Sequence, residues 1–158
     1  MFRTMRRHNQ EQPREECIRV LQTEKRGVLA VLGDEGYPYA VPLNFYYDEV
    51  ENKIYLHGAK EGHKLDAIRR CEKVCFTVWN QGFLKEGDWA YYVTSVVVFA
   101  RAELITDPEV TREKVRAIGL KYYPSAEDVD MLLQKTADRL QLISLQIDSM
   151  TGKLVHEK

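Results

Sequence analysis

The segment HGAKEGHK, from His57 to Lys64, brings together the residue types that could do chemistry at close spacing. It stands between a run with the pattern of a strand, IYLHG, and a run with the pattern of a short helix, HKLDAIRRC. The first N–H groups of that helix would point back toward the segment, and helix N-termini attract anions through such groups and through the helix dipole. The segment therefore predicts either a cradle for a phosphate group or an ordinary exposed connection between a strand and a helix.

The small and basic residues of this segment fit the phosphate cradle. Gly58 and Ala59 would let a ligand come close to the backbone, and Gly62 permits a backbone conformation that other residues rarely adopt. His63 and Lys64 add hydrogen-bond donors or positive charge beside the expected helix N-terminus. On the alternative interpretation, Lys64 is a solvated lysine of the first helical turn.

A second segment with binding chemistry is YAVPLNFYYD, which contains Pro42 and Asn44. Proline cannot donate to a sheet ladder, so Pro42 marks a sheet edge or a local break, and neighbouring backbone groups are left free to bond a ligand. Asn44 offers both a donor and an acceptor, and Phe45 offers aromatic surface. A flat heterocycle with amide-like edges would suit this segment. An edge strand with ordinary aromatic packing is the alternative.

The elements that must position these segments follow from the spacing of apolar and turn residues. Helices are expected at residues 14–25, at residues 63–71, after Asp107 with Pro108 at the first position, and after Ser125. Strands are expected at residues 27–33, 38–48, 53–58, 73–79, 90–106 and 140–148. Hairpins dominate this order, so the predicted fold is mainly β with flanking helices, a six-stranded antiparallel sheet that closes into a barrel because closure removes exposed edges.

Composition and charge exclude several classes of protein. The 158 residues suit a single domain, and a formal net charge of −1 argues against a general nucleic-acid binder, which needs a concentrated basic face. No apolar run approaches the ~18 residues of a membrane span. The three cysteines favour a reducing, cytoplasmic location over a disulfide framework. Neither a GxSxG nor an HExxH motif is present, so no serine hydrolase or zinc site is expected. Residues 1–13 are expected to form a flexible tail.

Taken in order, these segments resemble a known family. The stretch RGVLAVLGDEGYPYAVPLNFYYDEVENKIYLHGAKEGHKLDAIRRCEKVCFTV, followed by SVVVFARAELITD, is similar to the pyridoxamine 5′-phosphate oxidase-like, FMN-binding split-barrel superfamily. Within it, the chain most resembles the nitroimidazole-resistance (Nim-type) flavoproteins. The resemblance runs from about Glu16 to Asp148, and its most specific parts are the G-x-P-x-x-V-P-L-N-F strand and the HGAxxGxK turn.

The resemblance implies a six-stranded split β-barrel that forms a homodimer with two FMN sites at the subunit interface. The phosphate would bind at the strand-to-helix turn, with Lys64 as its main charged partner and His63 assisting. The isoalloxazine ring would lie along the strand that carries Pro42, and residues around Thr94 would also lie near the cofactor. The cofactor-binding residues implied in this way are Pro42, Leu43, Asn44, Phe45, His57, Gly58, Ala59, Gly62, His63, Lys64, Ser95 and Val96.

The resemblance also implies a class of reaction. The chain ends DSMTGKLVHEK and lacks the arginine-rich C-terminal pattern of pyridoxamine phosphate oxidases proper, so vitamin B6 oxidation is not expected. The expected function is an oxidoreductase that passes electrons from a reduced donor such as NAD(P)H, through FMN, to a small acceptor such as a nitro-aromatic compound.

His57 is the candidate catalytic residue, because imidazole titrates near neutral pH and could donate a proton from the end of its strand. It could equally be a half-buried strand histidine that serves only the fold.

Two alternatives to the enzyme remain open. One is a flavin-binding protein without fast turnover, such as a carrier, a redox sensor or an electron-transfer partner. The other is a relative on the same barrel that binds haem or deazaflavin.

Overall fold

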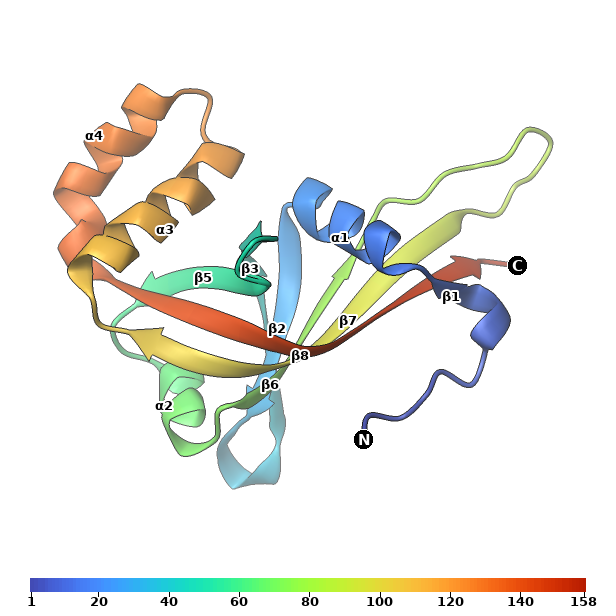
Figure 1. Cartoon of the computed structure of the whole chain (residues 1–158), viewed down its shortest axis with the longest axis horizontal. Coiled ribbons are helices and arrows are strands. Elements are labelled where there is room, and N and C mark those ends of the chain that lie inside the picture. Colours follow the sequence, from blue (N-terminus) through green and yellow to red (C-terminus); the bar gives the residue numbers. More distant parts are fainter.

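The computed structural model describes residues 1–158, and its centre is one curled antiparallel sheet (Figure 1). Neighbouring strands follow the order β3-β2-β6-β7-β8-β5-β4, and β1 pairs with β8 beside this path. The strands are β1 (Glu11–Gln12), β2 (Arg26–Leu32), β3 (Pro38–Asn44), β4 (Tyr46–Asp48), β5 (Lys53–Ala59), β6 (Lys73–Trp79), β7 (Tyr92–Ile105) and β8 (Leu140–His156). Six of them are long and correspond to the six expected strands, whereas β1 and β4 are short additions.

The helices begin where the sequence places their caps. They are α1 (Arg14–Thr23), α2 (His63–Arg70), α3 (Pro108–Tyr122) and α4 (Ala126–Thr136), with short 3₁₀ turns η1 (His8–Gln10), η2 (Asp34–Gly36) and η3 (Ala137–Arg139). The Asp107 carboxylate accepts the N–H groups of Glu109 and Val110 at 2.8 and 3.1 Å, and the Ser125 hydroxyl accepts the N–H of Asp128 at 3.1 Å. Both expected N-caps are therefore confirmed. None of the helices is long and apolar enough to span a membrane.

The structure differs from the expected elements near both ends of the chain. β8 continues to His156 instead of ending at Asp148, because β7 pairs along it as far as the pair Tyr92–His156, with one irregularity between Phe99 and Ala100. At the other end, Glu11 and Gln12 pair with β8. Contact with the sheet therefore begins before residue 13, where the expected flexible tail would end.

The barrel closes through one bent segment of chain. β3 pairs with β2, and β4, which follows it after a single residue, pairs with β5. Because β3 and β4 are the two ends of the strand order, the segment Pro38–Asp48 joins the two edges of the sheet. The expected split β-barrel architecture is confirmed, and so is the expectation that Pro42 lies on an edge strand.

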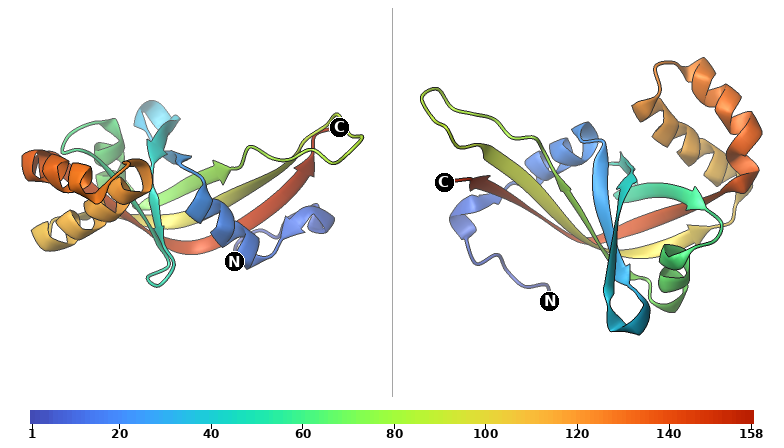
Figure 2. Two further views of the ribbon diagram at one scale, coloured as in Figure 1. Left: turned by 90° about the horizontal axis from the view of Figure 1, so that it is seen from above. Right: turned by 180° about the vertical axis from the view of Figure 1, so that it is seen from behind.

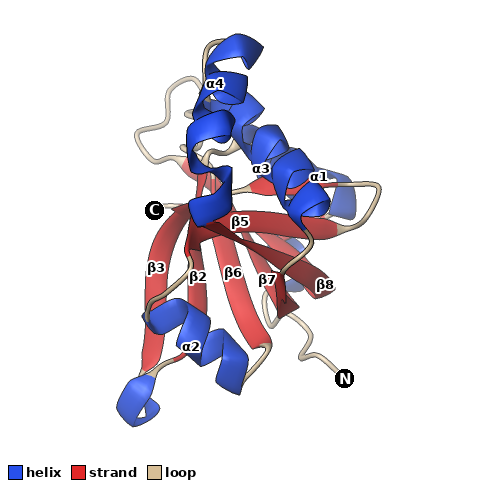
Figure 3. Ribbon diagram, turned by 90° about the vertical axis from the view of Figure 1, so that its left-hand side faces the viewer, coloured by secondary structure: helices blue, strands red, loops and turns tan.

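Two apolar cores stabilise this arrangement, one inside the curled sheet and one outside it. The inner core packs side chains of the sheet against α1 and α2. The outer core lies where α3 and α4 cover β5 and β8, and its buried members are Tyr55, Val115, Ile118, Val129, Leu133 and Leu142. Figures 2 and 3 show α3 and α4 together at one end of the sheet, and Figure 3 shows α2 lower down, across the lower parts of β2 and β6. The loop after β6 extends away from the opposite end of the sheet, beside the C-terminus.

The bend between β3 and β4 is fixed by the end of α3. Phe45 is fully buried and packs edge-on against Phe76, with ring centroids 5.2 Å apart. The hydroxyl of Tyr122 accepts the N–H of Phe45 at 2.9 Å and donates to the carbonyl of Lys25. The ammonium group of Lys121 donates to the Phe45 carbonyl at 3.2 Å and lies 3.8 Å from the Phe45 ring centroid. Burial lowers the pKa of Lys121 to about 8.

We predict that Tyr122→Phe lowers the free energy of unfolding by about 1–3 kcal/mol, because it leaves the N–H of Phe45 without its partner beneath the protein surface. Urea denaturation followed by circular dichroism measures the change. Tyr123→Phe is the matched control, since the neighbouring tyrosine is 45% exposed. Equal stabilities for the two variants would show that the Tyr122 hydroxyl does not hold the bend.

Candidate functional site

His57 faces the helices and not the barrel interior. On β5 it follows Leu56, which is fully buried in the inner core, so strand alternation directs His57 to the opposite face. There it lines a cavity of about 140 Å³, the His57 cavity, together with Asn44 and side chains of α3 and α4. The apolar residues of the lining include Val115, Ile118, Val129, Leu132, Leu133 and Leu140. Two residues singled out in the sequence, Asn44 and His57, thus meet at one site.

The imidazole of His57 is unpaired and neutral. Its Nδ1 atom is buried and has no hydrogen-bond partner in the chain. Burial lowers the pKa of His57 below its usual 6.5, and the positive charge of Lys64 lowers it further. A buried polar atom without a partner is unusual in a folded protein and indicates a place for a ligand or a water molecule.

The turn before α2 has the features of an anion cradle. Gly62 has a φ of +134°, the left-handed conformation that glycine adopts most readily, and it stands at the N-cap of α2. The first backbone bonds of the helix run from the N–H groups of Leu65 and Asp66 to the Gly62 carbonyl, so the N–H groups of His63 and Lys64 precede them. These donors and the helix dipole are available to an anion.

Gly58 places the Lys64 ammonium group beside this turn. A Cβ atom on Gly58 would lie 3.0 Å from Lys64 Nζ, closer than most side-chain contacts allow. The glycine therefore makes room for the lysine side chain to cross the end of β5. Lys64 lies near His57 as well, since its charge contributes to the lowered pKa of the imidazole. Gly58 and Lys64 therefore contact each other at the end of β5, next to the turn that contains Gly62.

His63 fastens α2 to the turn between β2 and β3. Its ring stacks on Tyr39 with centroids 4.2 Å apart, and its Nε2 atom accepts the N–H of Asp34 at 3.2 Å. Arg70, at the other end of α2, pairs with the Asp34 carboxylate at 2.7 Å. The imidazole is therefore engaged in positioning the helix, and its backbone N–H is the group that it offers to an anion.

The other predicted residues lie apart from the cradle. The side chains of Phe45 and Val96 are fully buried, and Leu43 packs against the inner core. Ala59 is exposed at the end of β5. Ser95 pairs with Trp79 across β6 and β7.

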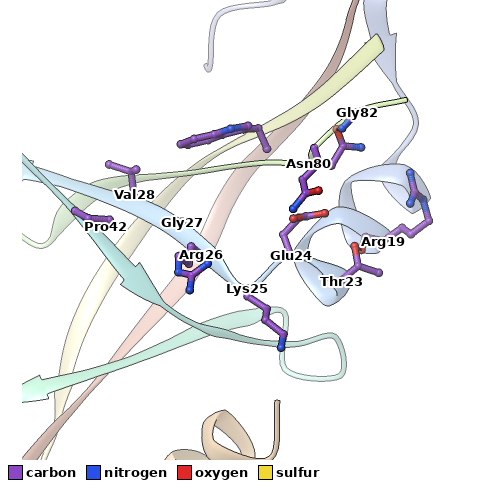
Figure 4. A pocket seen from close by; sticks show the side chains of 12 residues that line it. Arg19, Thr23, Glu24, Lys25, Arg26, Gly27, Val28, Pro42, Asn80 and Gly82 are labelled. Carbon is purple, nitrogen blue, oxygen red and sulfur yellow. Dashed lines mark hydrogen bonds between the residues drawn. The ribbon is translucent and has the colours of Figure 1, made fainter. Parts of the chain in front are cut away.

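Pro42 belongs to a second hollow that the sequence analysis did not identify. This hollow, the Trp79 pocket, has a volume of about 800 Å³. Figure 4 shows Arg19, Thr23 and Glu24 at the end of α1, Arg26 at the start of β2, and Asn80 and Gly82 in the loop after β6. The signals for it were the run EKRG at the start of β2 and a tryptophan at the end of β6. Gly27, the last residue of that run, is 52 residues from Trp79 in the sequence, and the two stretches meet only because β2 pairs with β6.

A comparison with known protein families shows to which family the chain belongs. The sequence profile of the family described as pyridoxamine 5′-phosphate oxidase matches residues 13–154. The chain belongs to this family. The resemblance seen in the strand and turn motifs is therefore confirmed. No curated protein sequence matches the chain.

Several solved structures share the fold of this chain. A candidate 5-nitroimidazole antibiotic resistance protein from Bacteroides thetaiotaomicron is 24% identical, with a TM-score of 0.74 over 90% of this chain and 84% of that chain. An FAD-binding protein from Mesorhizobium loti is 24% identical, with a TM-score of 0.68 over 92% of this chain and 96% of the other. A flavocytochrome from Azotobacter vinelandii is 22% identical, with a TM-score of 0.79 over 96% and 72% of the respective chains.

We predict that the pKa of His57, measured by NMR titration, lies below 6.5 and rises in Lys64→Ala. Lys60→Ala is the matched control and leaves the pKa unchanged, because the Lys60 charge does not act on His57. Above about pH 6.5 the imidazole is neutral in both the folded and the unfolded chain, and His57 costs the folded state nothing. As the pH falls from there toward the pKa of folded His57, the protein loses stability, because the unfolded chain takes up the proton first. In that range wild-type stability falls more steeply than that of His57→Gln. A measured pKa above 6.5 would contradict the buried, neutral state.

Proposed function

We propose that this protein binds FMN and is an oxidoreductase that passes electrons from NAD(P)H to a small acceptor such as a nitro-aromatic compound. The observation that carries the proposal is the cradle before α2, where Lys64 Nζ crosses Gly58 beside the free N–H groups of the helix N-terminus. The proposal is supported by relatives of the same fold that are described as an FAD-binding protein and a flavocytochrome.

FMN fits this cradle better than a larger flavin. One ammonium group and two backbone N–H groups suit a single terminal phosphate, which charge-assisted hydrogen bonds hold strongly. The isoalloxazine ring would then lie on the exposed face of β3. Pro42 and Asn44 are both on this face, two residues and therefore about 7 Å apart, and β3 is an edge strand whose outer backbone groups can bond the polar edge of the ring.

The acceptor would occupy the His57 cavity. An apolar cavity of about 150 Å³ holds one benzene-sized ring, and the His57 cavity is of this size. Its apolar walls suit an uncharged ring, and the unpaired Nδ1 of His57 suits a polar substituent. When FMN is bound it supplies the redox chemistry, while the neutral imidazole of His57 would orient the acceptor by a hydrogen bond. His57 would donate a proton to the acceptor only from its protonated form, and the lowered pKa means that this form gains population as the pH falls.

We further propose a homodimer with the flavin at the interface. The outer face of β2, β6 and β7 forms an apolar hollow of about 420 Å³, lined among others by Ala30, Leu32, Cys75 and Phe99. Phe2 of the same chain stacks on Phe99 with ring centroids 5.6 Å apart, and even so Phe99 is 45% exposed and Leu32 58% exposed, which is typical of a surface that another molecule covers. The His57 cavity is smaller than a flavin, so a second copy would complete the site. Sedimentation of the flavin-loaded protein as a monomer would contradict this arrangement.

We predict that Lys64→Ala weakens FMN binding by about 10- to 100-fold, the equivalent of a lost charge-assisted hydrogen bond. Fluorescence titration of the flavin-free protein measures the affinity. Lys60→Ala removes the same charge from the exposed part of the turn and serves as the control. Unchanged affinity in Lys64→Ala would refute the phosphate cradle.

The function itself is tested by anaerobic reduction of the flavin-loaded protein. NADH or NADPH is expected to bleach the flavin absorbance, and a nitro-aromatic acceptor is expected to restore it. His57→Ala should keep its FMN affinity and lose about 100-fold in acceptor turnover, the usual loss when a general acid is removed. His156→Ala is the control, because this histidine lies at the far end of β8. Bound flavin that no nicotinamide donor reduces would instead favour the non-catalytic flavin protein.

A further inference from the structure

The Trp79 pocket adjoins the proposed flavin site, since Pro42 belongs to both, but the function proposed above assigns it no ligand of its own. Its volume of about 800 Å³ lies within the range of small-molecule sites, and it opens between the end of α1, the start of β2 and the loop after β6 (Figure 4). We propose that this pocket binds a nucleotide, with an aromatic ring of the nucleotide against Trp79 and a phosphate against Arg26.

The charge of the lining suits a phosphate. Three cationic residues, Arg19, Lys25 and Arg26, line the pocket together with one carboxylate, Glu24. The ammonium group of Lys25 lies over the ring of Tyr122, 5.9 Å from its centroid, which leaves Arg26 as the cation nearest to Trp79 in the pocket lining. Arg19 is already paired with Glu16 at 2.7 Å, whereas Arg26 and Lys25 form no ion pair within the chain. A guanidinium group offers two parallel donors to a phosphate, so Arg26 is the main anion-binding group of the pocket.

The indole of Trp79 suits a planar ring. This side chain is 54% exposed at the end of β6, and it stacks on no other aromatic residue of the chain. Indole faces bind nucleotide bases by stacking, which tolerates different bases because each has a π face. An exposed indole beside a free guanidinium group therefore matches a ligand that combines a ring with a phosphate.

The loop wall of the pocket is held in one conformation. The side-chain oxygen of Asn80 accepts the N–H groups of Gly82 and Thr94 at 3.1 and 2.9 Å. Phe83 and Tyr92 exchange two backbone hydrogen bonds directly after it. The side-chain NH₂ group of Asn80 is then left to donate a hydrogen bond to a ligand. A preformed wall lowers the conformational entropy that binding would cost.

The position of the pocket suggests which nucleotide it takes. Pro42 lines the pocket and lies on the same exposed face of β3 as Asn44, which lines the His57 cavity. A nucleotide in the pocket would therefore lie next to the proposed flavin ring, where a nicotinamide electron donor must be. The identification of the nucleotide as the donor rests on the proposed function, whereas binding of a ring with a phosphate does not.

Calorimetric titration of the flavin-loaded protein with NADP⁺, AMP and adenosine tests the proposal. NADP⁺ and AMP are expected to bind, and adenosine, which lacks the phosphate, is expected to bind at least ten-fold more weakly. Arg26→Glu should weaken AMP binding ten-fold or more. Arg112→Glu makes the same charge change on the exposed face of α3 and should leave it unchanged.

Tryptophan fluorescence locates the ligand, because the chain has only two tryptophans, Trp79 and Trp89. AMP is expected to quench the emission of Trp89→Phe, which retains Trp79, and to leave that of Trp79→Phe unchanged. The proposal is overturned if neither nucleotide binds, if adenosine binds as tightly as AMP, or if Arg26→Glu behaves like Arg112→Glu. A protein that binds AMP in this way but is not reduced by NADPH would refute only the proposed function.

Discussion

The structure depends on the burial of Phe45 at the bend between β3 and β4. A strand that leaves one sheet edge and joins the other must turn sharply, and the turn exposes backbone groups that no strand can pair. Here the ring of Phe45 enters the inner core, while its backbone N–H and carbonyl bind Tyr122 and Lys121 at the end of α3. The same contacts anchor α3, so the contacts that close the barrel also place the helix pair over β5.

Closure also decides what the edge strand can bind. Because β3 pairs only with β2, one side of its backbone stays free, and its exposed face carries both Pro42 and Asn44. The His57 cavity meets this face at Asn44 and the Trp79 pocket meets it at Pro42. A flat cofactor on β3 would therefore lie between an apolar cavity with a neutral histidine and a polar pocket with unpaired cations.

The anion cradle depends on contacts outside the loop that forms it. α2 is only eight residues long and is oriented by His63 and Arg70, which bind the turn between β2 and β3 through Asp34. With the helix held in this way, Lys64 crosses Gly58 at the end of β5. The positive charge that would serve the proposed cradle also lowers the pKa of His57, so the two parts of the proposed site are coupled electrostatically.

The sequence by itself determined the elements, the family and the parts of the site that are local in the chain. Apolar alternation and capping residues such as Asp107 and Ser125 located strands and helices, because these signals act between near neighbours. Gly62 and Lys64 could be predicted to belong to an anion-binding turn for the same reason. Only the tertiary structure decided that Phe45 and Val96 are core residues, that His63 binds Asp34, and that Trp79 and Arg26 share a pocket. These outcomes depend on which strands pair and which face of each strand is covered, and pairing between distant segments is fixed by the packing of the whole barrel.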